Sequence, residues 1–325
     1  MRRRSCLSVL TFAALAATMG LPVHAAEQYP SKPIRLIVPF PPGGLSDALA
    51  RILARGVSQD WKQQLVIDNR PGAGTTLAAD IVAKSPPDGY TLFYQDITTH
   101  GINAGLYRKL PYDSVKDFVP IAMVSASPLI LCVHPSLSVK SVKELVALAK
   151  AQPGRITFGS SGNGTILHLS GALLMKLAKI DLTHVPYKGS APAVTAVLSG
   201  EVGMTFGTTT SVIPHLKSGK IRGLAVTTRE RSPMFPDLPP IAQTVPGYDV
   251  KLYQGIIAPA GIAPGIVKKL NGELNGIMGR PENKAQWATY GAQVVPLTPG
   301  EFAARFKEEI DKLSKITLES GARID

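Results

Sequence analysis

The chain has 325 residues, long enough to bury a sizeable core and to form two domains. Lysine and arginine outnumber aspartate and glutamate by 35 to 23, which gives a formal net charge of +12. The basic residues are scattered, without a run of five or more and without interleaved aromatic residues. We therefore expect no nucleic-acid partner, and the charge suits small anions better.

The first residues have the pattern of a secretory signal peptide. Three consecutive arginines precede an apolar run over residues 7–19, and Val23-His24-Ala25 resembles a small-x-small cleavage site. We predict a signal peptide over residues 1–25 and export of a soluble mature chain with a net charge of +9. Removing the peptide leaves Cys132 as the single cysteine, so stability depends on the core and not on an internal disulfide.

A strand, a tight turn and a helix are predicted near the start of the mature chain. Residues 34–38 form a short apolar segment, and apolar residues then recur at helical spacing from Leu45 to Val57. The turn exposes free amides at a helix N-terminus, where Gly43 and Gly44 allow an anion to approach. We hypothesise that this loop holds a carboxylate of a small organic acid. An ordinary strand–helix connection would have the same pattern.

The same arrangement recurs in the second half, with a strand over 155–158, a glycine-rich turn over 159–165 and a helix over 166–179. This turn carries more side-chain donors than a plain connection needs. It is not a nucleophile elbow, because Asn163 stands where the second glycine should be. One turn into the helix, His168 would either orient a ligand or form a local hydrogen bond.

Other segments organise the chain into a doubly wound α/β pattern. Strands at 65–68 and 90–94 flank a helix at 75–84, which is typical of a parallel sheet. Two apolar runs, 119–124 and 129–133, are separated by small residues and a proline, as expected for a hinge between domains.

The sequence gives little support to catalysis or metal binding. The six histidines are scattered and include no His-x-x-x-His pair, so we expect no metal site and no cofactor. A dinucleotide enzyme is disfavoured because the 72–74 turn lacks a third glycine. An exported hydrolase or isomerase using Ser161 or His168 remains the alternative to a binding protein. The carboxylates available for acid–base chemistry would be Asp47, Asp88, Asp96 and Asp113.

Several motifs spread over nearly the whole mature chain resemble one family, the Bug-type (TctC-like) receptors. These are the periplasmic substrate-binding proteins of tripartite tricarboxylate transporters. The matching motifs are Tyr29-Pro30-Ser31-Lys32-Pro33-Ile34, the Pro-Phe-Pro-Pro-Gly-Gly-x-x-Asp loop ending at Asp47, Asn69-Arg70-Pro71-Gly72-Ala73-Gly74, Pro87-Asp88-Gly89-Tyr90-Thr91-Leu92, Leu110-Pro111-Tyr112-Asp113, Val185-Pro186-Tyr187-Lys188-Gly189 and Ala258-Pro259-Ala260-Gly261.

The resemblance implies an α/β fold of the two-domain periplasmic-binding-protein type (Venus flytrap, type II), each lobe a mainly parallel sheet flanked by helices. Lobe 1 would comprise residues 26–127 and 249–325, and lobe 2 residues 128–248. It also implies a periplasmic protein without catalysis, which binds a small carboxylate and delivers it to membrane permease subunits. We expect it to act as a monomer.

The resemblance also implies a set of ligand-binding residues at loops that border the cleft. Three of them, Thr98, Thr99 and His100, correspond to a loop of the family. The full set is Phe40, Gly43, Gly44, Asp47, Thr98, Thr99, His100, Gly159, Ser160, Ser161, Asn163, Thr165 and Gly207.

The chain departs from the family at two places near this set. Family members often carry acidic residues where this chain has Gly203 and Gly207, with an aspartate at the position of Gly207. We therefore hypothesise a ligand without a cationic amine, a plain or aromatic carboxylic acid. A tryptophan that is frequent in the family near Tyr253 is also absent, which leaves the size of the ligand open.

Overall fold

A computed structural model describes residues 29–319 of the chain. The predicted signal peptide, residues 1–25, lies outside the described residues. Within the described part, no helix combines the length and the apolar character needed to cross a membrane.

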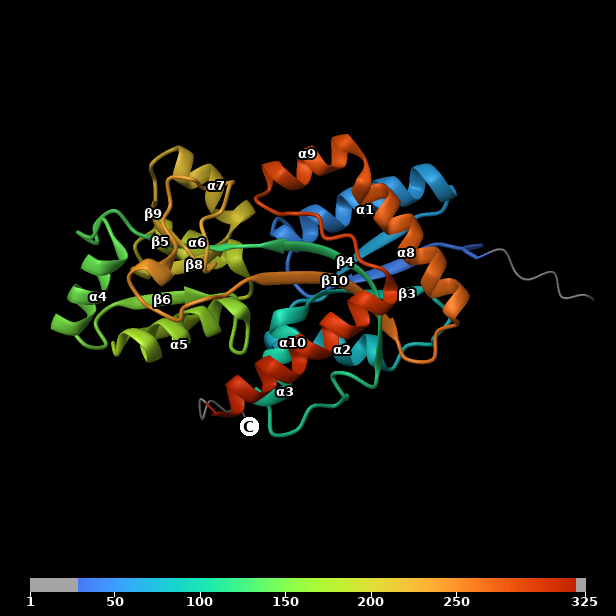
Figure 1. Cartoon of the computed structure of the whole chain (residues 1–325), viewed down its shortest axis with the longest axis horizontal. Helices are drawn as coiled ribbons and strands as arrows, with labels where there is room; N and C mark the ends of the chain where they lie inside the picture. The colour runs from blue at the N-terminus through green and yellow to red at the C-terminus, as the bar shows by residue number, and fades with distance from the viewer. Residues whose placement is uncertain (1–28, 320–325) are drawn as a thin grey trace, which may run out of the picture.

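Each of the two lobes is built on a five-stranded sheet (Figure 1). In the first sheet β1 pairs in parallel with β2 and β3, whereas β10 pairs antiparallel with β3 and β4. The strands, in spatial order, are β2 (Leu65–Asn69), β1 (Ile34–Val38), β3 (Thr91–Asp96), β10 (Leu252–Pro259) and β4 (Phe118–Ser127).

The second sheet repeats this plan. Here β6 pairs in parallel with β7 and β8, and β5 pairs antiparallel with β8 and β9. The predicted two-lobe α/β fold is confirmed, with both sheets mixed because the strands that cross between lobes pair antiparallel. The strands, in spatial order, are β7 (Thr183–Pro186), β6 (Thr157–Ser160), β8 (Met204–Thr208), β5 (Leu129–Val133) and β9 (Arg222–Val226).

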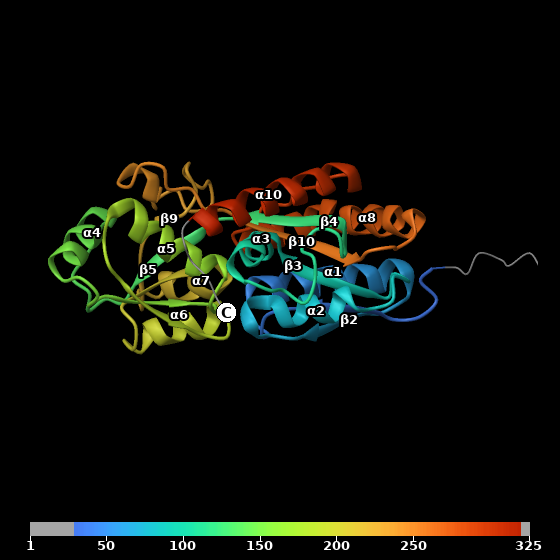
Figure 2. The same ribbon diagram turned by 90° about the horizontal axis from the view of Figure 1, so that it is seen from below.

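Helices cover both faces of each sheet (Figures 1 and 2). In lobe 1, helices α1, α8 and α9 pack on one face and α2, α3 and α10 on the other. In lobe 2, α4 and α5 cover one face, and α6 and α7 the other. The helices are α1 (Leu45–Trp61), α2 (Thr76–Ala83), α3 (Ile97–Leu106), α4 (Val142–Ala151), α5 (Ile166–Ala178), α6 (Ser190–Leu198), α7 (Thr209–Lys217), α8 (Pro264–Gly279), α9 (Pro281–Thr289) and α10 (Pro299–Glu319), with short 3-10 turns η1 (Ala73–Thr75) and η2 (Ile241–Gln243).

The chain crosses between the lobes where β4 of the first sheet gives way to β5 of the second, with only Pro128 between them. It returns between β9 and β10. The proline at the first crossing has no amide to donate, so the hydrogen-bonded pairing of β4 ends there and the chain enters the second sheet. The exact lobe boundaries remain a prediction.

The predicted apolar face of α1 is fully buried, including Leu49 and Leu53. In α5 the leucines that recur at helical spacing are not all buried, because Leu177 is 37% exposed and Leu169 and Leu173 are half-buried. The helix turns small residues inward instead. A Cβ at Gly171 would lie 2.3 Å from the ring of Phe158, so glycine lets the helix approach β6 closely.

Candidate ligand-binding site

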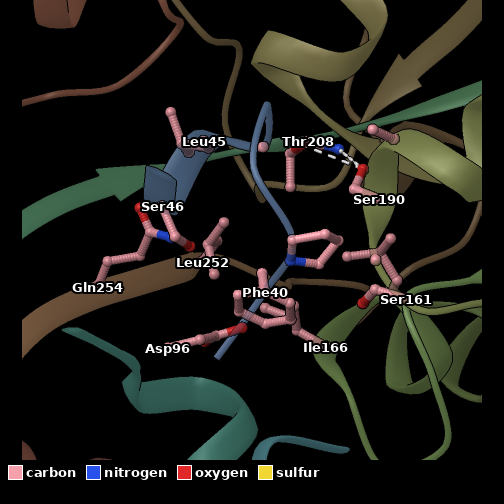
Figure 3. A pocket seen from close by; sticks show the side chains of 15 residues that line it. Phe40, Leu45, Ser46, Asp96, Ser161, Ile166, Ser190, Thr208, Leu252 and Gln254 are labelled. Atoms are coloured by element: carbon pink, nitrogen blue, oxygen red, sulfur yellow. Dashed lines mark hydrogen bonds between the residues drawn. The ribbon is translucent and has the colours of Figure 1, made fainter. Parts of the chain in front are cut away.

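A cavity lies between the two lobes and is lined by residues of both (Figure 3). This slot between the lobes has a volume of about 440 Å³, part of which is open to solvent. Lobe 1 contributes Phe40, Pro41, Gly44, Leu45, Ser46, Asp96, Leu252 and Gln254, and lobe 2 contributes Ser161, Ile166, Leu167, Gly189, Ser190, Ala191 and Thr208.

Three helices begin at this cavity: α1 after its N-cap Gly44, α5 after Thr165 and α6 after Gly189. None of these N-caps makes a side-chain capping bond, and none of the described residues that line the cavity is lysine, arginine or histidine. A carboxylate here would meet amides and helix dipoles in place of a cationic side chain. Each helix end contributes about 0.3–1 kcal/mol to binding an anion.

The loop of lobe 1 is braced by the carboxylate of Asp47. This carboxylate accepts hydrogen bonds from the amide of Gly43 at 3.1 Å, from Nε and Nη2 of Arg51 at 2.9 and 3.0 Å, and from Asn69 at 3.2 Å. Burial raises the pKa of Asp47, but the bonds from Arg51, Gly43 and Asn69 outweigh it and hold the pKa below its usual value. Asp47 is absent from the cavity lining, whereas Phe40 and Gly44 of the same loop are part of it.

The loop of lobe 2 is braced by neutral groups. Ser160 lies 2.6 Å from Nε2 of His184, and Nδ1 of His168 accepts the amide of Gly164 at 3.3 Å. The two imidazole rings stack with centroids 4.1 Å apart. Burial lowers the pKa of His168, and burial together with His168 lowers that of His184 to about 4. The loop therefore rests on a pair of uncharged imidazoles.

Of the predicted residues in this second loop, Ser161 lines the cavity and donates to Thr165 at 2.9 Å. Thr165 in turn donates to the carbonyl of Gly162 and provides the N-cap of α5. Gly159 and Asn163 belong to the same loop but are not part of the lining.

The catalytic alternative finds no support in the contacts of its two candidate residues. Ser161 bonds Thr165, and His168 bonds the amide of Gly164, so they do not form a nucleophile–base pair. The short Ser160–His184 contact involves a fully buried serine. Within residues 29–319, histidine, cysteine and carboxylate side chains nowhere gather in threes as a metal would require.

Thr98, Thr99 and His100 were expected on a loop, but they lie in the first turn of α3. The helix begins there because Asp96 caps it and accepts the amide of Thr99 at 3.1 Å. Thr99 reaches the other lobe, where its hydroxyl accepts the amide of Ile166 at 3.1 Å. His100 is fully buried, bonded to the carbonyl of Ser114 at 2.9 Å, and does not line the cavity.

Gly207 is buried in β8 and does not line the cavity. A Cβ at this position would lie 2.2 Å from Cγ1 of Val212, so a side chain there would point into the core of lobe 2. The acidic side chain that does line the cavity is Asp96.

Sequence reasoning missed the polar residues that distant segments bring to the cavity. Gln254 donates to Ser46 at 2.7 Å and accepts from Ser125 at 3.0 Å. On the other side, Ser190 accepts the amide of Thr208 at 2.9 Å. The one signal available for α6 was the glycine at position 189 directly before a helix, the same signal that identified α1.

Comparisons with known proteins agree with this geometry. The model of the tripartite tricarboxylate transporter family receptors (TctC) matches residues 49–321. BugT of Bordetella pertussis is 34% identical over 320 residues, covering 98% of each chain.

Solved structures are similar over most of the chain. The R. palustris protein Rpa4515 with adipate is 35% identical with a TM-score of 0.87, covering 91% of this chain and 100% of that one. MatC of Rhodopseudomonas palustris with bound malate is 31% identical with a TM-score of 0.84, covering 89% and 100%. This chain belongs to the tripartite tricarboxylate transporter family of receptors, a family of binding proteins and not of enzymes.

Proposed function

We propose that the protein is a periplasmic receptor that captures a small carboxylic acid between its lobes and delivers it to the permease of a tripartite tricarboxylate transporter. The observation that carries this proposal is the convergence of three helix N-termini on one interlobe cavity, none of them capped by the side chain of its own N-cap residue. Membership of the receptor family and the adipate and malate of two similar proteins support the same ligand class.

The cavity suits a dicarboxylate with an apolar body. The amides of α1 lie on one side and those of α5 and α6 on the other, so the two ends of a diacid can each meet a helix. Between them, apolar side chains such as Phe40, Leu252 and Ile166 come from both lobes. Each charge-assisted hydrogen bond contributes about 1.5–3 kcal/mol, and four to six of them, less the cost of closure, leave about −8 kcal/mol, a micromolar affinity.

Calorimetric titration of the mature protein tests this proposal. The panel contains adipate, malate, an aromatic carboxylate and adipamide, which has the length of adipate but no charge. We expect at least one acid to bind at micromolar affinity and adipamide not to bind. At about a hundred times its dissociation constant, the bound acid should add about 2.7 kcal/mol to the free energy of unfolding. Binding of adipamide as strong as that of adipate, or no binding at all, would contradict the proposal.

The helix α1 offers a variant that blocks the site without harming the fold. Gly44 is the N-cap of α1, a Cβ added there would have no neighbouring atom within 4 Å, and its φ of −82° is one that any residue adopts. In Gly44→Asp the new carboxylate caps the helix favourably and occupies the amides that a ligand would use. We expect ligand affinity to fall by about tenfold or more, with no loss of stability.

Gly265→Asp provides the matched control. Gly265 lies in the first turn of α8, also with open space around it, and is not part of the cavity. Its new carboxylate should leave ligand affinity unchanged. If both variants lost affinity equally, the loss would come from the added negative charge and not from blocking a site at α1.

Export is the part of the proposal that rests on the sequence alone. Cell fractionation followed by N-terminal sequencing should place the protein in the periplasm with Ala26 or Glu27 as its first residue. A protein that keeps residues 1–25 and stays inside the cell would contradict it.

A further inference from the structure

Among the described residues that line the interlobe cavity, Asp96 carries the one carboxylate. It ends β3, caps α3 and is only 2% exposed, and Figure 3 draws it among the side chains around the slot. Burial raises its pKa to about 7, a stronger effect than the lowering by the hydroxyl and amide of Thr99 and the amide of Thr98. Near neutral pH this carboxyl therefore exists in both protonation states.

The hydrogen bonds of Asp96 fix its orientation but do not exhaust its oxygens. One oxygen accepts the amide of Thr99 at 3.1 Å, and the other accepts the hydroxyl of Thr99 at 2.6 Å. The same hydroxyl accepts the amide of Ile166, the first residue of α5, from the other lobe. A carboxyl group has about four acceptor positions, so Asp96 keeps free positions at a cavity wall shared with the start of α5.

No cation of the described chain balances Asp96 within the cavity lining. The charged and titratable side chains of the surrounding elements are engaged elsewhere or exposed to solvent. Tyr94 donates to Gln254, His100 bonds Ser114, Asp47 bonds Arg51, His168 stacks on His184, Glu309 pairs with Arg305, and Lys188 and Lys251 are exposed.

A dicarboxylate entering this slot would meet a third carboxyl group. When two carboxylates share a site, their repulsion strongly raises the pKa of one of them, so that this group tends to hold a proton. A protonated carboxyl also becomes a hydrogen-bond donor, which a ligand carboxylate can accept.

We propose that Asp96 is the proton-carrying residue of the ligand site: protonated, it donates a hydrogen bond to a carboxylate of the ligand, and ionised, it opposes a dianion, so that binding takes up a proton. This inference rests on the proposed function of the cavity. It makes Asp96 a specificity-determining residue, which favours carboxylates and weakens their binding as the pH rises.

The wild-type protein tests the proposal without any substitution. Adipate and malate are titrated calorimetrically at about pH 7 in two buffers with different enthalpies of ionisation. We expect the binding enthalpy to depend on the buffer, with the uptake of up to one proton per bound diacid. Affinity should fall about tenfold between about pH 6.5 and pH 8.5. Binding of both diacids without proton uptake would refute the proton-carrying role of Asp96 but not the receptor function. If neither diacid binds, the receptor function itself is refuted.

Asp96→Asn assigns the proton to this residue. Asparagine is a good N-cap and offers an amide donor, so the helix start is retained. We expect the affinity of the variant for diacids to be independent of pH over this range, and binding to take up no proton. Asp113→Asn is the control, because Asp113 also accepts backbone amides, from Val115 and Lys116, but lies outside the cavity lining. Proton uptake that persists in Asp96→Asn would overturn the proposal, and the two-buffer measurement decides alone if that variant does not fold.

Discussion

The two loops that face each other across the cavity are held in different ways. In lobe 1, an ionised carboxylate, Asp47, gathers a backbone amide, a guanidinium and a side-chain amide. In lobe 2, hydroxyls and the stacked imidazoles of His168 and His184 hold the loop. The same strand–turn–helix motif is thus stabilised once by charge and once by neutral groups.

This difference makes the two loops sensitive to acid over different pH ranges. The pKa values of His168 and His184 are lowered in the folded state, so the native protein binds fewer protons than the unfolded chain. Their contribution to stability is complete above the usual value of 6.5 and is lost as the pH falls toward about 4. The pKa of Asp47 is also lowered, so its brace persists until the pH falls below the usual value of 3.8. Acid should therefore loosen the loop of lobe 2 first.

Asp96 acts on stability in the reverse direction. Because its pKa is raised from 3.8 to about 7, the folded protein binds an extra proton in this range, and stability falls as the pH rises through it. The histidines and Asp96 thus partly cancel in the wild type, and variants are needed to separate them.

The largest effect is expected from removing the charged brace of lobe 1. Asp47→Ala deprives Gly43, Arg51 and Asn69 of their shared acceptor. We expect the free energy of unfolding to fall by about 2–4 kcal/mol, a range already reduced because solvent screens the half-exposed arginine. Ligand affinity should fall about tenfold. Chemical denaturation and calorimetry measure both.

Asp311→Asn is the control for this variant. Asp311 pairs with Lys307 on α10, and both side chains are more than half exposed. Such a pair contributes about 0–1 kcal/mol. An Asp47→Ala protein as stable as this control would show that the lobe 1 loop does not depend on its carboxylate.

A smaller effect is expected where lobe 1 touches the lobe 2 loop. A Cβ at Gly74 would lie 2.4 Å from the carbonyl oxygen of Asn163, so Gly74→Ala should hold the lobes slightly apart. Gly219→Ala is the matched control, because both glycines have a left-handed φ, +57° and +68°, but Gly219 has open space. Both variants carry the same backbone cost of about 1 kcal/mol. We expect only Gly74→Ala to lose ligand affinity in addition, by about tenfold. Equal ligand affinities of the two variants would refute close packing of the lobes in the bound state.

The smallest effect concerns the neutral brace. In His184→Asn the side-chain amide can still form a hydrogen bond with Ser160 but takes up no proton. The acid-dependent loss of stability between about pH 6.5 and pH 4 should shrink by about 1 kcal/mol, a value reduced for the partial exposure of this ring. His134→Asn is the control, because it removes a partly buried histidine that bonds Ser136 and is not part of the imidazole pair. Identical profiles for the two variants would contradict a role of the imidazole pair.

Much of the fold follows from local patterns in the sequence. Apolar spacing predicted β1 and α1, and the proline at position 128 marked the crossing between the two sheets. Both glycine turns were predicted at the starts of helices, since free amides, small residues and capping residues are adjacent in the chain. The family resemblance, carried by motifs from Tyr29 to Gly261, was confirmed.

The site was predicted less completely, because its remaining residues meet through packing. Gln254 reaches Ser46 across 208 positions of the chain, and no spacing rule predicts that contact. The partners of Asp47 follow from the fold of the loop, which turns the carboxylate toward Gly43 and Arg51. Asp96 was noted only as one of several possible acids, although aspartate is one of the residues preferred at the N-cap of a helix.

The most direct test of the account is a crystal structure of the mature protein with adipate. We predict one carboxylate at the amides that open α1, from Gly44 to Ser46, and the other at the starts of α5 and α6, with the apolar chain between the lobes. A diacid bound outside the interlobe cavity, or held there by lysine or arginine side chains in place of helix amides, would contradict it.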